Sequence, residues 1–198
     1  LDLLKKDWKK SENSFEQLSE KDIYNMIHQK SSSVVKWILI ISLIELSIGI
    51  LLNVLSFDID FFNKIDANGY SIYIEVLTVV NYVVILFFVY KFFKNYKTIS
   101  STDSTKKLMD DIISTRKTVQ YYIWYNLIMI AFSGLFGTYV ALSITEKTKH
   151  VTLDTSFMVI FCLACILIVG VLVFLFWLFY RLLYGRLLKK LFNNYNEL

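Results

Sequence analysis

Four long stretches of apolar residues, separated by shorter polar segments, dominate the pattern of this 198-residue chain. Each stretch is long enough to cross a hydrocarbon core of ~30 Å as a helix that rises ~1.5 Å per residue. The pattern therefore predicts an all-α polytopic membrane protein, in which four transmembrane helices form a bundle within the lipid bilayer. The predicted spans cover approximately residues 34–55, 72–94, 119–144 and 156–182.

The polar segments beside the spans also show helical spacing. In residues 95–118 and in the tail 183–198, apolar residues recur at the intervals that one face of a helix requires. We expect both segments to be helical extensions, one leading into the third span and one continuing the fourth. The chain contains no proline, so no proline kink or break is expected in these helices. Transporters that build their sites from broken helices commonly use Gly or Pro for the break, so unbroken helices argue against that design.

The first 33 residues are predicted to form a separate amphipathic helical segment ahead of a membrane domain at 34–198. Ser19 and Asp22 resemble a capping box, with Asp in place of the usual Glu, and predict the start of a helix that leads toward the first span. The three serines at 31–33 fit either a hinge or a solvated turn of this helix.

Residues 1–18 carry apolar side chains at helical spacing together with four basic and four acidic residues. A membrane-surface helix usually needs a basic polar face, which this balance does not provide. We therefore expect the apolar side chains to dock into a protein groove, either on the same chain or on a partner. They are Leu1, Leu4, Trp8, Phe15 and Leu18.

Basic residues are distributed unequally between the polar segments. Of 21 Lys and Arg residues, 18 lie on the side of the two termini, and only Lys64, Lys147 and Lys149 lie on the other side. The positive-inside rule then predicts that both termini are cytoplasmic. Lysine outnumbers arginine 18 to 3, which favours a bacterial source with a low GC content and hence a multi-pass protein of the bacterial inner membrane. A nucleic-acid partner is not expected, because the lysines alternate with acids or sit at helix ends.

The sequence contains no motif for catalysis or cofactor binding. Cys162 and Cys165 form a C-x-x-C pattern, but they lie inside the fourth predicted span, where nothing stabilises a thiolate. His28 and His150 are predicted on opposite sides of the membrane, so one chain cannot form a histidine-based metal site. We therefore expect no enzymatic activity, no metal and no cofactor. Ten aromatic residues near the inner span ends are predicted to form an aromatic belt at the membrane surface: Trp37, Tyr90, Tyr96, Tyr121, Tyr122, Trp124, Tyr125, Trp177, Tyr180 and Tyr184.

Glu45 is the one ionisable residue near the middle of a predicted span. A charge there costs roughly 2.5–3.5 kcal/mol on insertion scales, so the side chain should face the bundle interior or be protonated. Counted from the inner ends of the first two spans, Glu45 and Asn81 lie at similar depths, which predicts a polar pair. This pair is either a structural hydrogen bond or part of a proton or cation site. The structural interpretation is favoured, because transport routes usually present several polar groups from different helices.

A row of small residues, Ser133, Gly137 and Ala141, follows one face of the third span. Small residues four positions apart allow a neighbouring helix to approach closely. Packing inside the bundle is favoured over a dimer interface as the role of this row.

Several segments resemble a group of four-span inner-membrane proteins from Bacteroidota. They are LDLLKKDWKK at 1–10, SEKDIY at 19–24, HQKSSSVVKW at 28–37, LMDDII at 108–113 and YYIWYN at 121–126. The group has no established activity and is often encoded beside sigma factors. The resemblance therefore implies at most a regulatory partner, and no functional residue is carried over from it.

Together these patterns predict a non-catalytic integral membrane protein that acts as a scaffold, accessory subunit or regulator. Its cytoplasmic helices are expected to bind a protein partner or a second copy of the chain. The alternative is a small channel or transporter subunit that uses Glu45, and a membrane enzyme comes third.

Overall fold

The computed structural model describes residues 19–55, 58–102, 104–149 and 155–196, and every regular element in these ranges is an α-helix. The helices are α2 (Glu20–Leu55), α3 (Ile59–Ala67), α4 (Ser71–Ser100), α5 (Thr105–Lys149) and α6 (Thr155–Asn196). Four of them, α2, α4, α5 and α6, are long and apolar enough to cross a membrane. The prediction of an all-α protein with four potential spans is therefore confirmed.

The long helices extend well beyond the apolar stretches. α5 has 45 residues and α6 has 42, which correspond to about 68 Å and 63 Å of helix, roughly twice the ~30 Å of a hydrocarbon core. The predicted helical extensions are thus present. α5 runs from Thr105 into the third apolar stretch, and α6 continues through the tail as far as Asn196.

α2 begins at the predicted capping box. The backbone N–H of Asp22 donates to Ser19 Oγ at 3.2 Å, and the backbone N–H of Ser19 donates to Asp22 Oδ2 at 3.2 Å. From there α2 runs unbroken through residues 31–33, so the hinge alternative is wrong. The physical reason is tertiary packing. Ser31 is buried, and its hydroxyl accepts a hydrogen bond of 3.1 Å from Nδ2 of Asn194 on α6.

The segment between the first two spans contains α3, a short helix that its sequence pattern did not predict. The chain leaves α3 through a turn in which Gly69 has φ +75, a left-handed conformation that glycine adopts without steric cost. The backbone N–H of Gly69 donates to Asp66 O at 2.9 Å and closes this turn. Ile65 of α3 is buried against Val140 and Ile144 of α5.

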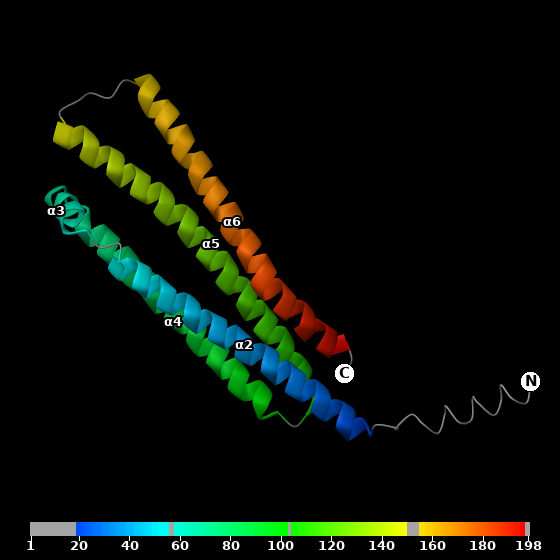
Figure 1. Cartoon of the computed structure of the whole chain (residues 1–198). Coiled ribbons are helices and arrows are strands. Elements are labelled where there is room, and N and C mark those ends of the chain that lie inside the picture. The colour runs from blue at the N-terminus through cyan, green and yellow to red at the C-terminus, as the bar shows by residue number, and fades with distance from the viewer. Residues whose placement is uncertain (1–18, 56–57, 103, 150–154, 197–198) are drawn as a thin grey trace, which may run out of the picture.

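The long helices lie side by side in two pairs, α2 with α4 and α5 with α6 (Figure 1). α4 also contacts α5, and α2 contacts α6, so the pairs face each other. The largest core lies near the first residues of α2 and α5 and the last residues of α4 and α6. We call this region the packed end. α6 diverges from α5 toward its own first residues (Figure 1). The packed end contains Val34, Val35, Ile38, Phe92, Ile99, Leu108, Ile112, Val119, Tyr122, Leu127, Tyr180, Tyr184 and Leu191.

The outer surface of the helices is apolar along most of their length. On α6, for example, Ile160, Leu167 and Phe174 are each more than half exposed. A surface of this kind is costly in water and suits the acyl chains of lipids. The exposed surface and the four long apolar helices together indicate a membrane protein.

Candidate functional site

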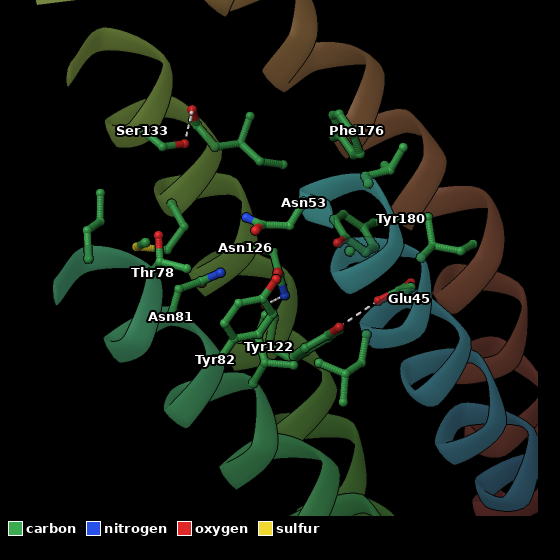
Figure 2. A pocket seen from close by; sticks show the side chains of 18 of the residues that line it. Glu45, Asn53, Thr78, Asn81, Tyr82, Tyr122, Asn126, Ser133, Phe176 and Tyr180 are labelled. Atoms are coloured by element: carbon green, nitrogen blue, oxygen red, sulfur yellow. Dashed lines mark hydrogen bonds between the residues drawn. The ribbon is translucent and has the colours of Figure 1, made fainter. Parts of the chain in front are cut away.

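A cavity of about 480 Å³ lies between the four long helices, next to the packed end (Figure 2). Each of these helices contributes at least one polar side chain to its wall, which is otherwise apolar. This concentration of polar groups between apolar helices is the main candidate site. The polar lining consists of Glu45 and Asn53 from α2, Thr78, Asn81 and Tyr82 from α4, Tyr122, Asn126 and Ser133 from α5, and Tyr180 from α6.

Glu45 lies at the border between the cavity and the packed end. Its Oε2 accepts a hydrogen bond of 2.6 Å from the hydroxyl of Tyr122 (Figure 2). Its Oε1 is buried without a hydrogen bond. The hydroxyl of Tyr184 is close enough to interact with the carboxylate, but no bond of ordinary geometry joins the two. One oxygen of the carboxyl group thus accepts a hydrogen bond, and the other has no hydrogen-bond partner.

Tyr122 is held in place by surrounding aromatic rings. Its ring centroid lies 5.4 Å from those of Phe88 and Phe92 and 6.1 Å from that of Tyr184, all in edge-on arrangements. Such edge-to-face pairs each contribute about 0.5–1.5 kcal/mol beyond the area that they bury. The ring of Tyr122 is 1% exposed, so packing fixes its hydroxyl beside Glu45.

The predicted hydrogen bond between Glu45 and Asn81 is not formed. Asn81 does line the same cavity, but its Oδ1 accepts a bond of 3.1 Å from the hydroxyl of Tyr125. Glu45 and Asn81 therefore accept hydrogen bonds from two different tyrosines of α5, Tyr122 and Tyr125. Both residues line one cavity, but a depth counted from the span ends does not specify the direction in which a side chain points.

The small-residue row on α5 does not bring any of the described helices into close contact. Ser133, Gly137 and Ala141 are exposed, and a Cβ placed on Gly137 would have no atom within 4 Å. The close approach occurs instead at Gly134, where a Cβ would lie 2.9 Å from Cγ2 of Val169 on α6. Ser133 is also part of the cavity wall.

Two further groups of residues were singled out in the sequence. The apolar N-terminal side chains (Leu1, Leu4, Trp8, Phe15 and Leu18) lie outside the described residues. Cys162 and Cys165 are free thiols on α6. Within the part of the chain that the structure describes, no group of three or more His, Cys, Asp and Glu side chains could hold a metal ion.

Three tyrosines of the site were assigned by sequence to the aromatic belt. Trp37, Tyr90 and other members of that set are indeed more than half exposed. Tyr122, Tyr180 and Tyr184, in contrast, are buried in the core. The helical spacing could have identified two of them as buried. Tyr180 and Tyr184 are four residues apart and lie on the same helix face as Leu191.

The model of a domain of unknown function, DUF8845, matches residues 21–198 of the chain. The chain belongs to the DUF8845 family. The DUF8845 match covers nearly all of α2 and the whole of α3 to α6, and hence every residue that lines the cavity. No protein with a curated description and no solved structure matches the chain.

Proposed function

We propose that the protein is a non-catalytic membrane scaffold, accessory subunit or regulator that binds a protein partner through the helical extensions of α5 and α6. The observation that carries this proposal is a groove of about 350 Å³ between these two helices at the packed end. Its wall combines apolar side chains with two cations, Arg116 and Lys117. The apolar side chains are Ile112, Ile113, Leu188, Leu191, Phe192 and Tyr195.

The groove has the features of a site for an amphipathic helix. All of its lining residues except Gln120 lie beyond the predicted spans 119–144 and 156–182, on the side of the membrane surface that these spans predict. Ile113 is 39% exposed and Phe192 is 42% exposed. The guanidinium of Arg116 lies 4.9 Å from the centroid of the Phe192 ring. Aromatic and arginine side chains dominate the binding energy of many protein interfaces, and grooves of this kind accept the apolar face of a helix.

Three hydrogen bonds between distant segments join α2 to other parts of the chain at the packed end, beside this groove. The hydroxyl of Tyr24 donates to Thr102 O at 2.7 Å, and Nε2 of His28 lies 2.6 Å from Ile99 O. The third is the bond from Asn194 to Ser31 described above. A preformed groove loses less conformational entropy on binding than a flexible one. The packed end is therefore suited to bind another protein.

We further propose that the packed end faces the cytoplasm of a bacterial cell, with both termini inside. The support is the excess of 18 basic residues over 3 on the two sides of the predicted spans. Cysteine labelling tests this orientation in a chain whose natural thiols are replaced by Cys162→Ser and Cys165→Ser. We expect Asn68→Cys and Thr148→Cys to react with an impermeant maleimide in intact spheroplasts, and Ser104→Cys to react only after lysis. Labelling of Ser104→Cys in intact spheroplasts would show the opposite orientation.

Photo-crosslinking in native membranes tests whether a partner protein binds in the groove. Benzoylphenylalanine in place of Phe192 is expected to give a product larger than the chain by the mass of one partner protein, since this ring lines the groove. The matched control is the same replacement of Phe174, which is 58% exposed on the apolar part of α6. The Phe174 position should give no protein product, and Ile113→Asp should abolish the product from Phe192.

Two outcomes would contradict binding of a foreign partner. A product with the mass of two chains would assign the groove to a homo-oligomer. A crosslink within one chain to residues 1–18, identified by mass spectrometry of peptides, would show that the N-terminal segment occupies the groove.

A further inference from the structure

The cavity beside Glu45 contains one acidic group and no basic group. Among the residues that line it, Glu45 is the one acid, and there is no Lys, Arg or His. The surrounding helices are apolar, and charges in such a medium attract each other more strongly than they do in water. With the carboxyl group of Glu45 ionised, the cavity therefore favours a cation over an anion of the same size.

A metal ion does not fit this cavity. Hard cations such as Ca²⁺ and Mg²⁺ require several oxygen ligands in direct contact. Glu45 supplies the one carboxylate of the lining, and its Oε2 already accepts a hydrogen bond from Tyr122, so the cavity offers a metal ion at most one charged ligand residue. The carboxylate of Glu45 can still attract a cation electrostatically without direct contact. This kind of attraction suits a cation with a delocalised charge, because such a cation needs no coordinating ligand atoms.

The cavity wall suits an organic cation in both chemistry and size. Rings of Tyr82, Phe176, Phe179 and Tyr180 line it, and the faces of aromatic rings attract cations. A volume of about 480 Å³ lies within the range of pockets for small organic molecules. We infer that this cavity binds a small organic cation whose charge is spread over apolar groups.

The arrangement points to a binding site and not to an open pore. Tyr122 and Tyr184 are at most 1% exposed, and together with Phe92 they fill the space between the helices on the side of the packed end. A bound molecule would thus enter from the side of the cavity that faces away from the packed end. This site is separate from the groove at Phe192, so the test below does not depend on the proposed function.

Two ions of nearly equal shape and opposite charge test the inference. The purified full-length chain in a non-ionic detergent is equilibrated with tetraphenylphosphonium or with tetraphenylborate, and binding is measured by equilibrium dialysis. We expect saturable binding of the cation and no saturable binding of the anion. Glu45→Gln should weaken binding of the cation at least about tenfold, which corresponds to a lost interaction of about 1.4 kcal/mol. The matched control is Glu75→Gln, an exposed position outside the lining, which should leave the affinity unchanged.

A second variant tests the site without removing its charge. Gly49 lines the cavity, and a Cβ placed on it would meet no atom within 4 Å. Gly49→Leu should therefore fill part of the cavity and abolish binding of tetraphenylphosphonium, whereas Gly137→Leu, at an open position outside the lining, should not. Equal binding of both ions, or an unchanged affinity in both Glu45→Gln and Gly49→Leu, would overturn the inference. Thermal unfolding in the same detergent identifies a variant that has lost its fold, and the other variant then decides.

Discussion

Tyr184→Ala is expected to lower the free energy of unfolding by about 3–5 kcal/mol, the range for removal of a large buried aromatic side chain. Tyr184 is fully buried at the packed end. Its ring centroid lies 6.1 Å from that of Tyr122 and 5.9 Å from that of Tyr180, so the truncation leaves a cavity beside two further rings. The measurement is unfolding in mixed micelles with increasing mole fractions of sodium dodecyl sulfate, monitored by circular dichroism.

Two controls separate ring packing from other contributions. Tyr121→Ala removes the same side chain at a position that is 67% exposed, and we expect no measurable loss of stability. Tyr184→Phe keeps the ring and removes a hydroxyl that has no hydrogen bond, so its effect should stay within about 1 kcal/mol. If Tyr184→Phe destabilised the protein as much as Tyr184→Ala, the interaction of the hydroxyl with Glu45 would outweigh the packing of the ring.

The long helices could be predicted from the sequence because their signals are local. Hydropathy over about 20 residues is sufficient to identify a span, and the absence of proline leaves no reason for a break. The start of α2 was predictable for the same reason, since a capping box needs only the four residues from Ser19 to Asp22. α3 was missed because a helix of nine residues beside acids and aromatic rings has too short a pattern to stand out.

The burial of individual residues could not be predicted in the same way. Tyr121 and Tyr122 are neighbours of the same type, yet one is 67% exposed and the other 1% exposed. In a soluble helix the polar side would have distinguished them. Here the surface that faces lipid is as apolar as the core, so periodicity carries little information about which face is buried.

The partner of Glu45 was mispredicted for a related reason. Counting residues from the span ends gives depth, and both Glu45 and Asn81 do line one cavity. The rotation of each helix and the reach of a tyrosine side chain decide the hydrogen bond, and neither follows from counting. As a result Tyr122 and Tyr125, placed in the aromatic belt by sequence, are the residues that bind the two polar side chains.

The small residues of α5 show a third limit of sequence patterns. A spacing of four identifies the row of Ser133, Gly137 and Ala141, but the neighbouring glycine is the one that α6 approaches. A Cβ on Gly134 would lie 2.9 Å from Cγ2 and 3.4 Å from Cγ1 of Val169. Valine is stiff about χ1, so its side chain has little freedom to move aside.

Gly134→Leu should therefore lower the free energy of unfolding by about 1–3 kcal/mol, the usual cost of forcing extra volume into a packed contact. We expect the larger side chain to push α6 away from α5. Gly137→Leu adds the same atoms to the same helix, less than one turn away, but into open space, and it should leave the unfolding transition in mixed micelles unchanged or slightly strengthened. Distances between spin labels on α5 and α6 should increase in the first variant alone. Equal destabilisation by both variants would instead show that a helix packs against the exposed row, as it would in a dimer.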